Sequence, residues 1–210
     1  MIQKGLVSVT FRNLTPQEII LLCKENNLSG IEWGGDIHVP HGDVETAKAV
    51  KSQTEQAGLS VLAYGSYYRA GTYGEKFREE FEKVLDSAIA LSAPIIRIWV
   101  YEKGSAEISS DTYERIITEV RSICDRAKEF GKKISFECHN NTLTDEYHSS
   151  AQFMKDIDRQ NATMYWQPNQ FRSEEYNIES LKALLPYITN VHVFHWIGTE
   201  KFTLSKGISI

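Results

Sequence analysis

The sequence predicts an α/β fold in which parallel strands alternate with helices and form a (β/α) barrel. Three observations favour this fold: seven short runs rich in β-branched and aromatic residues, amphipathic segments between them, and polar residues at the carboxyl ends of several runs. Alternating strands and helices form a parallel sheet, because each helical connection returns the chain to the same end of the sheet. The length of 210 residues suits a single domain of this kind spanning residues 1–210.

The seven predicted strands are spread over the whole chain. They are Gly5–Phe11, Gly30–Gly34, Leu59–Tyr67, Pro94–Val100, Lys133–His139, Ala162–Pro168 and Asn190–Trp196. About 14 residues follow the seventh run, whereas a further strand and helix need roughly 25 or more. The sequence therefore predicts an incomplete barrel of seven strands that lacks the eighth strand–helix unit.

End signals define the helices between these strands. Thr15 is expected to cap the first helix. A later helix is expected to begin at Asp111, with Glu114 completing a capping box. Gly58 and Gly131 are expected to end their helices in the left-handed conformation.

A barrel is preferred over an open, doubly wound sheet. A doubly wound nucleotide-binding fold carries a glycine-rich turn after its first strand, and the turn here is "RNLTP". Polar residues stand instead at the ends of many strands, namely Glu32, Tyr64, Arg97, Glu137, Gln167 and His192. A barrel builds its active site from the carboxyl ends of several strands.

Composition excludes several functional classes. A net charge of -5 argues against a nucleic-acid partner, since such proteins usually carry a basic face. We expect a cytoplasmic protein without a membrane partner, because no run reaches the length of a membrane span and the N-terminus lacks the apolar core of a signal peptide. Three cysteines without paired spacing argue against a disulfide framework.

Glu137 is the first candidate for chemistry. Strand alternation places Ser135, Glu137 and His139 on one side of the fifth strand, towards the barrel mouth. A buried carboxylate is costly unless something pairs with it. Its partner is a metal, a sugar hydroxyl or a neighbouring side chain such as Arg97. Glu32 is a candidate sugar-binding or acid/base carboxylate, and an ion pair with Arg97 is equally expected there.

Gln167 and His192 extend this candidate site. Imidazole and carboxylate together suit Mn²⁺, Zn²⁺, Co²⁺ or Mg²⁺, and an amide oxygen is a weak ligand for a hard cation. We therefore predict that Glu137, Gln167 and His192 hold a divalent metal cation weakly. The alternatives are a core histidine at position 192 and an amide at position 167 that binds a hydroxyl or the next loop.

Aromatic rings near the strand ends suit the apolar faces of sugar rings, and they equally fill a barrel core. The candidate substrate contacts are Trp33, Tyr64, Arg97, Trp99, Asn169 and His195. His195 ranks second, because parity places it on the opposite side of its strand from His192. Cys138 points away from Glu137 for the same reason and is a poor candidate for a nucleophile.

Four segments in combination resemble the sugar phosphate isomerase/epimerase group of xylose-isomerase-like TIM barrels: "GIEWGGDIHVPHGD", "FECHNNTLT", "YWQPN" and "NVHVFHW". In that superfamily a Glu, an Asp, a His and a second Glu on late strands hold a divalent metal. Glu137 matches the first Glu and His192 the His, whereas Gln167 stands in the place of the Asp. The second Glu has no counterpart. Tyr64 stands where DNA-repair relatives carry a metal-binding His, which speaks against an endonuclease.

The resemblance implies metal-assisted proton transfer next to a carbonyl of a small sugar, sugar phosphate or keto-polyol. Glu137 would be the base and Glu32 a further catalytic carboxylate. Because the second acid/base Glu is missing, we expect little or no epimerase activity on ketohexoses. The alternative function is a non-catalytic carbohydrate-binding or scaffold protein. The open edges of the first and seventh strands predict a homo-oligomer.

Overall fold

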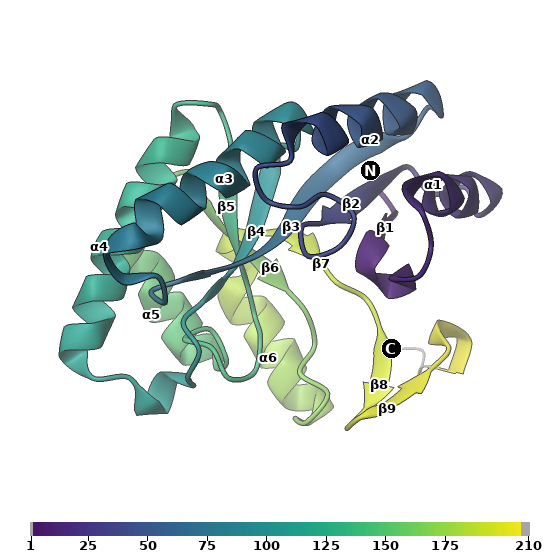
Figure 1. Ribbon diagram of the computed structural model, residues 1–210. Coiled ribbons are helices and arrows are strands. Elements are labelled where there is room, and N and C mark those ends of the chain that lie inside the picture. Colours follow the sequence, from purple (N-terminus) through teal and green to yellow (C-terminus); the bar gives the residue numbers. More distant parts are fainter. Residues whose placement is uncertain (1, 207–210) are drawn as a thin grey trace.

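The computed structural model describes residues 2–206, and its centre is a parallel sheet that curves into a half-barrel (Figure 1). The strands of this sheet are β1 (Gly5–Val7), β2 (Gly30–Gly34), β3 (Ser60–Ala70), β4 (Ile95–Val100), β5 (Lys133–Glu137), β6 (Ala162–Trp166) and β7 (Ile188–Val191). They lie side by side in sequence order, and every neighbouring pair is parallel. The prediction of an incomplete seven-stranded barrel is confirmed.

Helices connect the strands and cover the outer face of the sheet (Figure 1). The α-helices are α1 (Pro16–Glu25), α2 (Val44–Gln56), α3 (Phe77–Ala90), α4 (Ser110–Lys128), α5 (Tyr147–Ile157) and α6 (Glu174–Leu184). Short 3₁₀ helices are η1 (Ser8–Phe11), η2 (Gly74–Lys76), η3 (Ser105–Glu107), η4 (Leu185–Tyr187) and η5 (Leu204–Lys206). Among the helices of residues 2–206, none has both the length and the apolar character that crossing a bilayer requires.

The helix ends follow the expected chemistry with one correction. The Thr15 side chain caps α1, and the Glu18 carboxylate accepts the Thr15 backbone N–H at 2.7 Å. Helix α4 begins before Asp111, because the Ser109 hydroxyl accepts the Thr112 N–H at 3.3 Å and caps the helix. Gly58 and Gly131 have φ of 77° and 65°, as predicted for helix ends that need glycine.

Of the seven predicted strands only Gly30–Gly34 has the observed bounds, and the first and seventh runs change structure partway. The first ends at Val7, and its remaining residues form η1. The seventh begins at Ile188 and ends at Val191, while β8 (His195–Ile197) pairs with β9 (Glu200–Phe202) in a separate antiparallel hairpin. The hairpin lies apart from the half-barrel in Figure 1. Polar and apolar residues alternate from Asn190 to Val193 and again from Phe194 to Trp196, and the alternation is interrupted at Val193 and Phe194, between the two strands.

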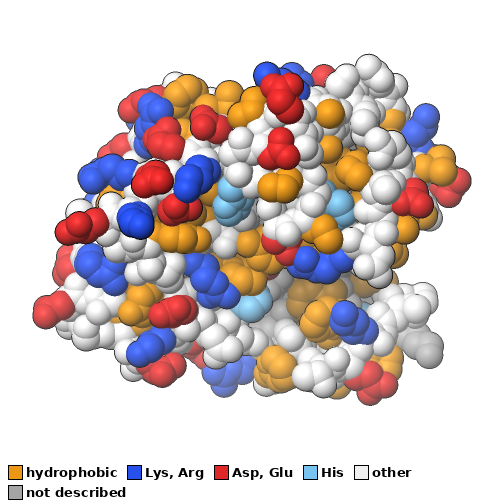
Figure 2. All heavy atoms as spheres, viewed as in Figure 1, with side chains coloured by type: hydrophobic (Ala, Val, Ile, Leu, Met, Phe, Trp, Pro, Cys, Tyr) orange, Lys and Arg blue, Asp and Glu red, His pale blue; other side chains and the backbone are white. Residues whose placement is uncertain are grey.

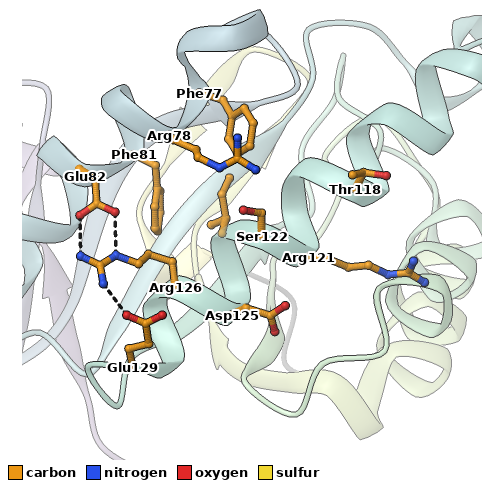
Figure 3. Close-up of a pocket in the computed structure, with 11 residues that line it drawn as sticks. Phe77, Arg78, Phe81, Glu82, Thr118, Arg121, Ser122, Asp125, Arg126 and Glu129 are labelled. Atoms are coloured by element: carbon orange, nitrogen blue, oxygen red, sulfur yellow. Dashed lines mark hydrogen bonds and ion pairs between the residues drawn. The ribbon is translucent and has the colours of Figure 1, made fainter.

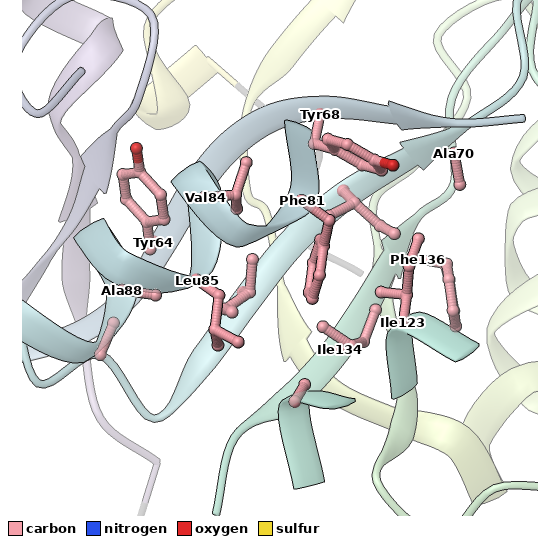
Figure 4. Packing of buried hydrophobic residues seen from close by; sticks show 14 of the residues in the cluster. Tyr64, Tyr68, Ala70, Phe81, Val84, Leu85, Ala88, Ile123, Ile134 and Phe136 are labelled. Carbon is pink, nitrogen blue, oxygen red and sulfur yellow. The ribbon is translucent and has the colours of Figure 1, made fainter. Parts of the chain in front are cut away.

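The main hydrophobic core lies between the sheet and its helices (Figure 4). Ile134 and Phe136 of β5 are fully buried there, with Phe81 and Leu85 of α3. Strand alternation turns the residues between them to the opposite face of the sheet. That face is the interior of the half-barrel, and its carboxyl end carries the charged side chains.

Candidate active site

Arg97 is at the centre of a buried charged cluster. Its Nε donates to Glu32 Oε1 at 2.7 Å, and its Nη1 donates to Glu137 Oε2. The three side chains come from β4, β2 and the end of β5, and all are nearly inaccessible to solvent. The ion pairs with Arg97 that the sequence left open for Glu32 and Glu137 are therefore both present.

Gly65 makes room for this cluster. A Cβ at this position of β3 would lie 2.6 Å from Arg97 Nη2 and 2.6 Å from Glu32 Oε1. Contacts that short do not occur between real side chains and a Cβ, so any larger residue would push the ion pair apart. The glycine lets the backbone of β3 approach the Arg97–Glu32 pair directly.

His192 joins the cluster from the residue after β7. Its Nε2 lies 3.2 Å from Glu32 Oε2, and its Nδ1 lies 3.4 Å from Glu137 Oε1 and 3.2 Å from Gln167 Oε1. The Gln167 amide donates to the Cys138 carbonyl at 2.9 Å, which turns its oxygen towards His192. The structure thus brings together the acidic and metal-binding candidates Glu32, Glu137, Gln167 and His192.

Mutual pairing sets the protonation states of these groups. Burial alone would raise the pKa of Glu137, but the Arg97 charge and hydrogen bonds from His192 and Trp99 lower it to about 2. The Arg97 and His192 charges also hold the pKa of Glu32 below its usual range. Burial would lower the pKa of His192, but Glu32 and Glu137 raise it to about 9. At neutral pH two carboxylates therefore face two cations.

Trp99 connects the cluster to the barrel mouth. Its indole N–H donates to Glu137 Oε2. Its ring centroid lies 5.2 Å from that of Tyr67 and 4.6 Å from that of His139. The Arg69 guanidinium lies 4.2 Å from the Trp99 ring centroid.

Three of these mouth residues were not among the predicted site residues. His139 shares the strand parity of Glu137, and that signal was sufficient to find it. Tyr67 and Arg69 share the parity of Gly65, but the sequence did not show which residues of β4 they meet. Between Gly65 and Arg69, four residues of β3 lie against the two steps from Arg97 to Trp99. An irregularity of this kind changes which side chains meet across two strands.

Three of the predicted substrate contacts lie away from the charged cluster. Trp33 is fully buried and packs edge-on against His38, and the Tyr64 hydroxyl donates to the Val39 carbonyl at 2.7 Å. His195 lies in the β8–β9 hairpin, where Nδ1 is 3.2 Å from the Thr203 carbonyl oxygen. Arg97 and Trp99 are in the cluster. Asn169 lies in the loop after β6 and donates to the Asn140 side chain at 2.9 Å.

The donor atoms of Glu137, Gln167 and His192 fit a hard divalent cation in position but poorly in charge. Neighbouring ligands of an octahedral cation at about 2.1 Å lie about 3 Å apart, close to the 3.2 Å and 3.4 Å that separate His192 Nδ1 from its two oxygen neighbours. Only one of the three donors is anionic, and His192 must lose a proton before it can ligate. Within residues 2–206, no three His, Cys, Asp or Glu side chains are arranged to hold a metal ion.

Known proteins share this fold and most of its length. A 3-dehydroshikimate dehydratase from Bacillus anthracis is 24% identical over 200 residues, which cover 90% of this chain and 70% of the relative. The crystal structure of the probable 3-DHS dehydratase AsbF from the same organism superposes with a TM-score of 0.78 at 22% identity, covering 91% of this chain and 72% of that chain.

Epimerases and a magnesium complex also share the fold. A 3-keto-D-glucoside 4-epimerase from E. coli matches with a TM-score of 0.73 at 16% identity, covering 92% of this chain and 80% of that chain. A protein of this fold from Mycobacterium smegmatis, solved with magnesium, matches with a TM-score of 0.67 at 13% identity, covering 92% of this chain and 76% of that chain. The family model described as "Xylose isomerase-like TIM barrel" matches residues 20–200. The chain therefore belongs to the xylose-isomerase-like TIM barrel family.

Proposed function

We propose that this protein removes a proton from a carbon next to a carbonyl in a small polyhydroxylated ketone. The observation that carries the proposal is the meeting of Glu137 with protonated His192 at the carboxyl ends of the strands, with 3.4 Å between Glu137 Oε1 and His192 Nδ1. A base and a proton donor side by side are what enolate chemistry requires. The named activities of the relatives, epimerisation and dehydration, are both compatible with this first step.

Glu137 is the proposed base. In the resting cluster its low pKa makes it a weak base, because Arg97, Trp99 and His192 all stabilise the carboxylate. A substrate oxygen that takes over the His192 N–H removes one of these hydrogen bonds and raises the proton affinity of Glu137. The same N–H then stabilises the negative charge that develops on the substrate oxygen. Glu32 keeps His192 oriented and charged through its contact of 3.2 Å with Nε2.

Glu137, Gln167 and His192 are the proposed ligands of a weakly bound divalent cation such as Mn²⁺, Mg²⁺, Co²⁺ or Zn²⁺. When bound, such an ion would supply Lewis-acid stabilisation of an enolate oxygen in place of the His192 N–H, because His192 must give up its Nδ1 proton to ligate. The support is the spacing of the three donors, together with the magnesium complex of the Mycobacterium smegmatis relative.

Elimination of water is the favoured outcome of this first step. Epimerisation removes a proton from one face of a carbon and returns one to the other face, which takes two acid/base groups on opposite faces of the substrate. Elimination takes one base and one proton donor for the departing hydroxyl. Glu137 and protonated His192 form such a pair, whereas both Glu32 oxygens are engaged by Arg97 and His192. The similarity over 90% of the chain to a dehydratase points the same way.

Proton exchange tests this proposal. The protein is incubated in D₂O with Mn²⁺ or Mg²⁺ and with D-fructose, D-allulose or 3-dehydroshikimate, and deuterium next to the carbonyl is followed by NMR. We expect exchange with at least one compound and loss of water from 3-dehydroshikimate. Loss of a general base costs about 10²–10⁴ in rate, so Glu137→Gln should be nearly inactive.

Glu129→Gln is the matched control, because Glu129 is an exposed carboxylate that pairs with Arg126 on the helical surface. It should leave the exchange rate unchanged. Binding of these ketones without exchange by the wild-type protein would instead support the alternative, a non-catalytic carbohydrate-binding protein.

A further inference from the structure

Arg69 differs from the other arginines around the barrel mouth in its partners. Arg97 is neutralised by Glu32 and Glu137, and Arg12 pairs with Asp36. Among residues 2–206, Arg69 forms no ion pair with an Asp or Glu. The only hydrogen bond of its guanidinium to these residues is from Nη1 to the Tyr101 carbonyl at 3.1 Å. Most N–H groups of the partly buried Arg69 guanidinium at the barrel mouth can therefore donate to a ligand.

The guanidinium of Arg69 is held in place by its surroundings. It lies over the Trp99 indole, with 4.2 Å between Cζ and the ring centroid. The Tyr101 carbonyl accepts a hydrogen bond from one end of the fork, and the backbone φ of Tyr101 is 62°. The N–H groups of a guanidinium lie in one plane, and such a fork matches the two oxygens of a carboxylate or phosphate.

One aromatic side chain links this cation to the proposed base. The Arg69 guanidinium lies over the Trp99 ring, and the Trp99 indole N–H donates to Glu137. The His139 ring packs against the same indole at 4.6 Å, and its Nε2 has no hydrogen-bond partner among the described residues. Figure 2 shows histidine side chains near the centre of the visible face, with Lys or Arg side chains beside them.

We propose that Arg69 binds an anionic group, a carboxylate or a phosphate, of the substrate that reacts at Glu137. The substrate is then an acidic hydroxylated ketone rather than a neutral sugar. This inference rests on the proposed function for the reaction, but anion binding at Arg69 is measurable without turnover.

Three six-carbon ketones that differ in charge test the proposal by calorimetry. They are D-fructose, which is neutral, D-fructose 6-phosphate and 5-keto-D-gluconate, which is a carboxylate. We expect one or both anionic ketones to bind at least about tenfold more tightly than D-fructose, as charge-assisted hydrogen bonds allow. The two anionic arms distinguish a phosphate from a carboxylate.

Arg69→Gln should abolish this preference, so that all three ketones bind within about twofold of one another. Arg69→Lys keeps the charge and should retain part of the preference at low salt, which shows that the site still folds. Arg78→Gln is the matched control: Arg78 stacks on Phe77 at 4.6 Å in a groove of about 500 Å³ between α3 and α4 (Figure 3). It should leave the preference intact.

The proposal is overturned if the wild-type protein binds neither anionic ketone more tightly than D-fructose, or if the preference survives in Arg69→Gln. Calorimetry separates this result from the reaction, because it measures binding without turnover. An anionic preference in a wild-type protein that exchanges no substrate proton would sustain the Arg69 site while the proposed reaction fails. Glu137→Gln should keep the preference.

Discussion

Arg97 holds two buried carboxylates with one guanidinium, and this shared contact makes the cluster sensitive to its loss. Arg97→Met leaves Glu32 and Glu137 buried at 3% and 5% exposure without their main cation. Removal of one partner from a buried ion pair typically costs about 3–5 kcal/mol. We expect Arg97→Met to lower the free energy of unfolding by about this amount, measured by urea denaturation at pH 7.

The control is Arg126→Met, which also removes an arginine from between two glutamates. Arg126 pairs with Glu82 and Glu129 on the helical surface, where solvent screens the charges, so its loss should change stability little.

Lower pH adds a second test of the contribution of Arg97 to stability. Arg97 depresses the carboxylate pKa values, so the stability that it contributes is present above the ordinary carboxyl pKa of about 4.3 and falls as the pH drops towards 2. The difference in free energy of unfolding between the wild-type protein and Arg97→Met should therefore become smaller below pH 4. Equal losses of stability in Arg97→Met and Arg126→Met at pH 7 would contradict the assignment.

Gln167 is the residue that leaves the candidate metal site short of charge. Gln167→Asp replaces its amide by a carboxylate beside His192 Nδ1. A second anion raises the affinity of a site for a divalent cation, and we expect Mn²⁺ to bind roughly tenfold more tightly in this variant by calorimetry. Gln170→Asp adds the same charge three positions away and should not change the affinity. If the two variants bind Mn²⁺ equally, Gln167 does not face the cation.

Helix α4 carries a buried carboxylate that holds the loop after β3. Glu119 is 4% exposed and accepts the Gly71 N–H at 2.7 Å. Burial raises the pKa of Glu119, so its ionisation is less favourable in the folded protein than in the unfolded chain. This unfavourable contribution is absent below the ordinary carboxyl pKa of about 4.3 and develops as the pH rises through the folded pKa.

Glu119→Gln keeps an oxygen for the Gly71 N–H and removes the charge. We therefore expect the stability of Glu119→Gln relative to the wild-type protein to rise between pH 4 and pH 7, measured by urea unfolding at each pH. Glu114→Gln is the control on the exposed side of the same helix, and its difference from the wild-type protein should stay constant. A relative stability of Glu119→Gln that falls over this range would contradict the prediction.

At the scale of the whole molecule, the sheet has two open edges. Among the strands of residues 2–206, β1 pairs only with β2, and β7 pairs only with β6. Beyond β7 the side chains of Val193 and Ile197 are 71% and 64% exposed. Unpaired strand edges and exposed apolar side chains both promote association. We expect a dimer or larger species by light scattering at micromolar concentration.

Charged substitutions locate this association. Val193→Lys and Ile197→Lys should shift the protein towards the monomer, because they place charge on the exposed apolar segment. Leu21→Lys is the control, since Leu21 is 55% exposed on α1. A monodisperse wild-type monomer would overturn the prediction.

Local sequence patterns were sufficient to predict the class of fold and the edge of the sheet where the candidate site lies. The periods of the apolar pattern predict alternating strands and helices, and parallel strands bring their carboxyl ends to one edge. That rule was enough to place Glu32, Arg97, Glu137, Gln167 and His192 near one another. It left the partner of Glu137 open between a metal, a sugar hydroxyl and a neighbouring side chain such as Arg97.

The contacts between individual side chains could not be predicted without the folded chain. A residue's parity gives the face of its strand but not the distance to a strand far along the chain. The contact between His192 and Glu32 depends on the curvature of the whole half-barrel. Parity also gives no sign of the register shift between Gly65 and Arg69, which brings the side chains of Tyr67 and Arg69 to Trp99. Packing across strands sets these contacts, and no local sequence pattern encodes them.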